Sequence, residues 1–128
     1  MMHGYKEFSA DVRKIFQDLI GTYSLTPVSE NDHMILFKSD KCILLVTTEF
    51  TYVEVAFKEH ENDQWMVLGP YLNVLYPEAR IKFTDASHLK QKDAILSSLK
   101  DMNNILTLYG RSFLTGDFSW RNEYDRRV

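Results

Sequence analysis

The sequence has little of what several protein classes require. It contains a single cysteine, Cys42, so no disulfide can form within the chain, and the apolar residues around it predict a buried, reduced thiol. No apolar run approaches the roughly 20 residues needed to cross a bilayer. The first residues also lack the apolar stretch of a signal peptide. We therefore expect a cytoplasmic protein with no membrane partner.

Charge of one sign is also scarce, since the formal net charge of the chain is only −3. Non-specific nucleic-acid binding depends on clustered lysine and arginine, so we expect no nucleic-acid partner. With 5 glycines and 3 prolines, the chain has no glycine-rich phosphate loop and no low-complexity linker. Its 128 residues are close to the commonest domain size and predict one domain over residues 1–128.

Residues that carry chemistry are not arranged in any recognisable pattern. The histidines His3, His33, His60 and His88 lack the spacing of zinc ligands. The acidic stretch 59–63 lacks the alternating ligands and the glycine of a calcium-binding loop. Cys42 lies in an apolar run, without the electropositive setting that lowers a thiol pKa. We therefore predict no metal site, no cofactor and no catalysis.

What the chain does have is two long helical patterns with short alternating segments between them. Apolar residues spaced three and four apart predict a first helix from about Tyr5 to Ile20, which Gly21 would end. The alternating segments predict four strands joined by short links, which connect antiparallel neighbours: Met34–Lys38, Cys42–Thr48, Tyr52–Lys58 and Gln64–Leu68. The segment Tyr23–Val28 fits an additional edge strand, where Pro27 is tolerated.

The register of these strands follows from their turns. Turn centres at Asp40-Lys41 and Glu49-Phe50 would place Ile35 opposite Val46, and Leu44 opposite Val55. Every such pair on one face is apolar, which defines a predicted inner face: Ile35, Phe37, Cys42, Leu44, Val46, Val53, Val55 and Phe57.

The opposite, outer face is polar at its margins but apolar in its middle. Two explanations are open. A second helix or the C-terminal segment could cover this face, which is the usual way to bury it. Alternatively, the face is an open surface that a partner or a second copy covers. For the second case the candidate partner-binding residues, including two in the acidic turn, are Leu36, Ile43, Leu45, Tyr52, Glu54, Glu61 and Asp63.

The last part of the sheet region leads to the second helix. Gly69-Pro70 is expected to break the fourth strand, and Tyr71–Phe83 is expected to be irregular or to hold one short strand. N-cap candidates at 84–87 predict a long helix that ends at about Tyr109, before Gly110. Together these elements predict an α+β fold, in which a four- to five-stranded antiparallel meander sheet is flanked by an N-terminal and a C-terminal helix.

The end of the chain combines a bend with several aromatic residues. Gly116-Asp117 can form the bend, while Phe113, Phe118 and Trp120 fold back onto the core. The segment Leu114–Trp120, together with the helix-meander-helix layout, resembles the C-terminal part of small bacterial immunity-type proteins. The resemblance implies a protein without chemistry of its own that neutralises a toxin domain by direct contact.

Two other kinds of function remain open. Secretion-type chaperones are similarly small and acidic, although their usual pattern places a helix among the strands, and here the strands are uninterrupted. A small-ligand-binding domain or enzyme would instead use the Tyr71–Phe83 region, with a pocket lined by Trp65, Tyr71 and Tyr76. We expect a non-enzymatic cytoplasmic protein-binding domain of the immunity type, as a monomer or a homodimer.

Overall fold

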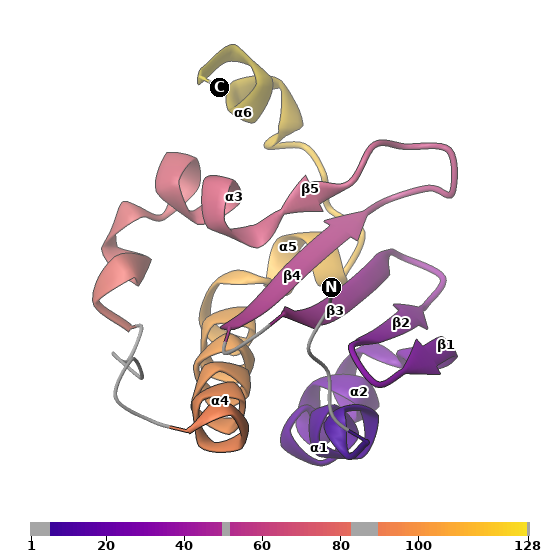
Figure 1. Cartoon of the computed structure of the whole chain (residues 1–128). Coiled ribbons are helices and arrows are strands. Elements are labelled where there is room, and N and C mark those ends of the chain that lie inside the picture. The colour runs from indigo at the N-terminus through magenta and orange to yellow at the C-terminus, as the bar shows by residue number, and fades with distance from the viewer. Residues whose placement is uncertain (1–5, 50–51, 83–89, 128) are drawn as a thin grey trace.

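The computed structural model describes residues 6–49, 52–82 and 90–127 and shows an α+β fold built on one antiparallel sheet (Figure 1). The sheet has the order β1-β2-β3-β4-β5, which confirms the predicted meander. Its strands are β1 (Thr26–Asn31), β2 (Met34–Lys38), β3 (Ile43–Glu49), β4 (Tyr52–Lys58) and β5 (Met66–Val67). The helices are α1 (Phe8–Ile15), α2 (Gln17–Tyr23), α3 (Leu68–Leu75), the 3-10 helix η1 (Pro77–Lys82), α4 (Gln91–Tyr109), α5 (Arg111–Leu114) and α6 (Arg121–Arg127).

The core lies between the inner face of the sheet and the helices α1, α2, α3, α4 and α5. In Figure 1, α1, α2 and α4 lie below the strands, and α5 lies behind β4. α1 packs against β1, β2 and α4, while α4 also packs against β4. All eight predicted inner-face residues are buried in this core. The alternation of apolar and polar residues therefore identified the inner face correctly, because side chains alternate between the two faces of a strand.

The register is confirmed for one hairpin and wrong for the next. Ile35 pairs with Val46 in β2 and β3, as predicted. In β3 and β4, however, Leu44 pairs with Phe57 and not with Val55, so the true register is displaced by two residues. A displacement of two leaves every side chain on its predicted face, because the strand period is also two.

The N-terminal helical region departs from the prediction in two places. The predicted helix from Tyr5, a residue outside the described ones, is divided at Phe16 into α1 and α2. The hydrogen bond from the Phe16 amide to the carbonyl of Val12, at 2.8 Å, continues the helical ladder across this kink. The helix does not stop at Gly21 but continues to Tyr23, and Ser24 ends it with a left-handed φ of 53°.

The edge strand lies further along the chain than predicted. β1 includes the turn-like residues Ser29, Glu30 and Asn31, and only the two residues after Asn31 form the turn. The Asn31 side chain accepts a hydrogen bond from the amide of His33 at 2.9 Å, which closes that turn. The register shifts between Pro27 and Ser29, so proline occupies an irregular edge strand, where its missing N–H costs little.

The fourth predicted strand is much shorter than expected, and a helix replaces the predicted irregular segment. β5 contains two residues, and α3 begins directly at Leu68. Gly69 and Pro70 were interpreted as breakers, yet they stand in the first turn of α3. Proline is tolerated there because the first N–H groups of a helix have no intrahelical partner. The N-cap candidates at 84–87 lie outside the described residues, and α4 begins at Gln91.

The C-terminal segment folds back onto the core, as predicted. After α5, the amide of Gly116 donates to Phe113 O at 3.1 Å and the amide of Asp117 donates to Ser112 O at 2.8 Å. This pair of bonds is the Schellman motif that ends many helices, and its left-handed residue is Gly116, with φ of 83°. Phe113 is fully buried, and Trp120 packs against the core.

Two glycines should respond oppositely to alanine substitution. A Cβ at Gly110 would lie 2.8 Å from the carbonyl oxygen of Leu106 and 3.2 Å from a side-chain carbon of Leu114, whereas a Cβ at exposed Gly21 would meet nothing within 4 Å. Gly110→Ala should lower the free energy of unfolding by about 1–3 kcal/mol through overpacking. Gly21→Ala should raise it by about 0.5–1 kcal/mol by favouring the helix. Urea denaturation measures both values, and equal effects of the two variants would contradict the packing described at Gly110.

Candidate partner-binding surface

The outer face of the sheet carries a continuous apolar row that crosses four strands. Leu36 pairs with Leu45, Leu45 with Ala56, and Ala56 with Val67, so the four side chains stand next to one another. Leu36, Leu45 and Val67 are half-buried, and none of them packs against the core cluster. We call these four residues the outer row.

The described helices leave the outer row uncovered. α1 and α4 both pack on the inner face, and Phe113 and Trp120 of the C-terminal segment join the same core (Figure 1). Of the two explanations left open by the sequence, cover by the second helix or by the C-terminal segment therefore does not hold for the described residues. Sequence periodicity shows that a helix has an apolar stripe, but it does not show which face of the sheet receives that stripe.

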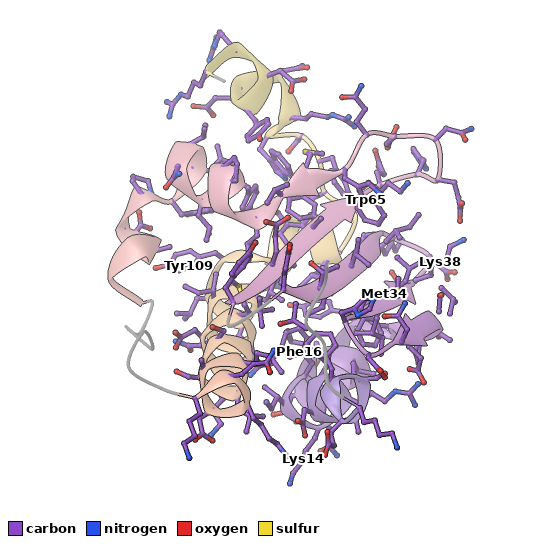
Figure 2. All side chains as sticks on the ribbon, in the orientation of Figure 1. Lys14, Phe16, Met34, Lys38, Trp65 and Tyr109 are labelled. Carbon is purple, nitrogen blue, oxygen red and sulfur yellow. The ribbon has the colours of Figure 1, made fainter. Side chains whose placement is uncertain are left out.

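A polar cluster closes one end of the outer face. Lys38 forms an ion pair with Glu61, and Lys58 Nζ donates to Glu61 O at 2.8 Å. Lys58 Nζ also lies 4.4 Å from the ring centroid of Trp65, within the range of a cation–π contact. The hydrogen bond from Lys38 and its positive charge hold the pKa of the Glu61 carboxyl below its usual value. In Figure 2, Lys38 and Trp65 lie at the end of the sheet beside the loop that joins β4 to β5.

The other end of the outer face is acidic and exposed. Tyr52 has 52% of its surface exposed, and Glu54, two residues along β4, is exposed as well. Glu49 pairs with Tyr52 across β3 and β4 and is half-buried. Neither Glu49 nor Glu54 forms an ion pair within the part of the chain that the structure describes. This end can therefore attract a positively charged group.

Five of the seven predicted partner-binding residues lie where a partner could touch them on the outer face or the adjoining loop: Leu36, Leu45, Tyr52, Glu54 and Glu61. Ile43 is also on the outer face but only 5% exposed, because its cross-strand neighbours are the long side chains of Lys38 and Lys58. Asp63 lies apart from this face: its carboxylate accepts the amide of His60 at 3.0 Å and is 3.8 Å from Arg121.

The sequence interpretation missed two residues of this surface, Val67 and Trp65. Val67 completes the outer row, and Trp65 flanks the polar cluster. Neither could be placed beforehand, because β5 has only two residues and so short a strand shows no alternation.

The aromatic pocket considered for a small ligand does not form. Tyr71 is fully buried, with its ring centroid 5.7 Å from that of Tyr76, whereas Trp65 lies beside Lys58 on the outer face. The Tyr71 hydroxyl donates to Tyr109 O at 2.9 Å, and burial raises the pKa of Tyr71 to about 12. Its proton therefore stays bound at neutral pH, and the side chain anchors α3 to the end of α4.

Cys42 is the only cysteine of the chain and is buried. Burial raises the pKa of the Cys42 thiol, although a hydrogen bond with Ser39 opposes the shift, so the reactive thiolate is disfavoured. Among the residues that the structure describes, no group of three histidine, cysteine, aspartate or glutamate side chains could hold a metal ion. No described helix is long and apolar enough to span a membrane.

Comparison with known proteins gives no relative for this chain. No protein-family model matches it, and neither a curated protein nor a solved structure resembles it significantly.

Proposed function

We propose that this chain is a non-enzymatic protein-binding domain that engages its partner through the outer face of its sheet. The observation that carries the proposal is the outer row, four apolar side chains in register on a face without a described helix. Exposed Tyr52 extends this surface, and tyrosine is among the residues that most often dominate binding energy at interfaces. An apolar centre with a polar margin is the usual anatomy of such a surface.

The narrower proposal is an immunity-type protein that neutralises a toxin domain by direct contact. It is supported by the resemblance of the segment Leu114–Trp120 and by the helix-meander-helix layout. The exposed acidic end of the outer face, at Tyr52 and Glu54, would suit a basic group on such a toxin. The candidate partner is a toxin domain encoded by a neighbouring gene, in the cytoplasm of the producing cell.

Two substitutions on the outer face test the proposal. Leu45→Glu places a charge in the outer row. Tyr52→Ala removes the exposed aromatic side chain that lies on the same face outside the row. Each should weaken capture of the purified toxin domain at least about thirtyfold, the size expected for a central interface residue. The free energy of unfolding should change by less than about 1 kcal/mol, since neither side chain packs against the core cluster. Calorimetric titration measures the affinity for the toxin domain, and urea denaturation measures the free energy of unfolding.

Val28→Glu is the matched control, because Val28 is 51% exposed but lies on the edge strand β1. It should bind the toxin domain like the unchanged protein. If Val28→Glu weakens binding as much as Leu45→Glu does, or if both outer-face variants bind normally, the proposed surface is wrong. If the unchanged protein never binds the purified toxin domain, the immunity-type proposal fails.

A further inference from the structure

A hollow of about 270 Å³ lies where β4, β5, α3 and α4 meet. The Ala56–Val67 pair brings Leu68 beside Val55, so the start of α3 closes this edge of β4 and forms one wall of the hollow. In Figure 1 the start of β4 lies between α3 and α4, and both helices contact the strand. The hollow is lined by Val53, Glu54, Val55, Val67, Leu68, Gly69, Pro70 and Met102.

The exposure of the lining residues distinguishes the base of the hollow from its mouth. Val53, Val55 and Leu68 are buried and therefore form the base. Glu54 and Pro70 are exposed and stand at the mouth. Apart from the carboxylate of Glu54, the side chains that line the hollow are apolar. Such a site favours an apolar group that enters past a single negative charge.

The volume and the lining of the hollow indicate what kind of group fits. Sites for drug-sized molecules usually have about 300–1,000 Å³, whereas an apolar cavity of about 150 Å³ is enough to hold benzene. A hollow of about 270 Å³ therefore suits one large side chain. Met102 of α4 is half-buried in the lining, and the methionine thioether makes favourable contacts with aromatic rings. These features favour an aromatic side chain.

The hollow is continuous with the candidate partner-binding surface. Val67 belongs both to the outer row and to the lining of the hollow, and Glu54 belongs both to the acidic end and to the lining. Exposed Tyr52 lies two residues from Glu54 on the same side of β4. A partner that lies on the outer row would therefore also reach the hollow. Interfaces concentrate much of their binding energy in a few anchors that fill such pockets.

The charge at the mouth restricts the residues that can accompany the anchor. Glu54 forms no ion pair within the described part of the chain, and neither does Glu49, which pairs with Tyr52 and lies diagonally across from Glu54. Two such carboxylates favour a positively charged side chain next to the ring and disfavour an acidic one.

We propose that the hollow receives an aromatic side chain of a protein partner, and that a lysine or arginine next to this aromatic residue meets Glu54. The inference rests on the proposed function and names the group that the surface recognises. Burial of the ring against the apolar lining supplies affinity, and the ion pair at the mouth supplies specificity.

The test uses the full chain with ¹³C-labelled methyl groups in methionine, valine and leucine, and the capped dipeptide Phe-Lys. In a titration followed by nuclear magnetic resonance, the methyl resonances of Met102, Val53 and Val55 should shift and saturate, because an aromatic ring displaces the resonances of groups beside it. We expect a dissociation constant of roughly 1 mM or below for a fragment of this size. The capped dipeptide Ala-Lys lacks the ring and should bind at least about tenfold more weakly.

One pair of variants tests the charge at the mouth. Glu54→Gln should weaken Phe-Lys about two- to fivefold, as expected for one exposed ion pair. Glu78→Gln is the matched control, because it removes an exposed carboxylate from η1 that does not line the hollow. It should leave the affinity for Phe-Lys unchanged. Equal effects of the two variants would overturn the proposed lysine or arginine.

Three results would overturn the proposed aromatic anchor: no saturable shift at the hollow, equal binding of Ala-Lys, or shifts confined to Leu36 and Leu45. The peptide is measured without the toxin domain, so the two proposals fail separately. If Leu45→Glu releases the toxin domain but Phe-Lys does not bind, the hollow is wrong and the proposed surface stands. If Phe-Lys binds but the toxin domain does not, the immunity-type proposal fails and the hollow stands.

Discussion

Replacing Phe57 by alanine should lower the free energy of unfolding by about 3–5 kcal/mol, the range for removing a buried aromatic ring. The Phe57 ring stacks on Phe113 with centroids 3.7 Å apart and planes 5° apart. It also meets Tyr71 edge-on at 5.4 Å and Trp120 at 6.1 Å. The substitution would therefore leave a cavity where β4, α3 and the C-terminal segment meet. Urea denaturation followed by circular dichroism measures the loss.

Phe57→Leu is the control for this cavity. It retains much of the buried volume but loses the ring contacts, so it should cost about 1–2 kcal/mol. A loss under about 1 kcal/mol for Phe57→Ala would show that the aromatic cluster does not support the fold as described.

Two adjacent leucines of β3 should differ sharply when each is replaced by alanine. Leu44 is fully buried on the inner face, whereas Leu45 is half-buried on the outer face and does not pack against the core cluster. Leu44→Ala should lower the free energy of unfolding by about 2–4 kcal/mol through cavity formation. Leu45→Ala should lower it by less than about 1 kcal/mol.

Because both residues are leucines and neighbours in one strand, the two substitutions change the local propensity for β structure equally. The difference between their losses in free energy of unfolding therefore reports the difference in burial between the two faces of the sheet. Parallel urea denaturation of both variants gives the comparison. Equal losses would mean that the outer row is buried as deeply as the core.

The sequence was most informative about features that depend on the two-residue alternation of side chains along a strand. The two faces of the sheet were predictable because alternation survives an error of two residues, as the pairing of Leu44 with Phe57 in place of Val55 shows. The same alternation predicted that Leu44, Val55 and Phe57 are inaccessible, and the structure confirms this.

Features that depend on contacts between distant segments were not predictable. Pro70 was expected to break the fourth strand, and β5 does end before it, at Val67, but the helix whose first turn contains Pro70 was not expected. The buried Tyr71 that follows finds its hydrogen-bond acceptor at Tyr109. Nothing local to the sequence around Tyr71 indicates a partner 38 residues away. The candidate partner-binding surface could likewise be predicted only in part from the sequence. Leu36 and Leu45 were identified, but the position of α4 decided that their face is uncovered.

The burial of Cys42 provides the protein with an internal reporter. It is the only cysteine of the chain, it is 1% exposed, and its pKa is raised. A thiol reagent in solution can therefore modify the folded protein only when the structure opens, so the labelling rate measures the population of opened molecules. The same property prevents the native protein from forming a covalent dimer under oxidising conditions, since that bond requires an accessible sulfur in both copies.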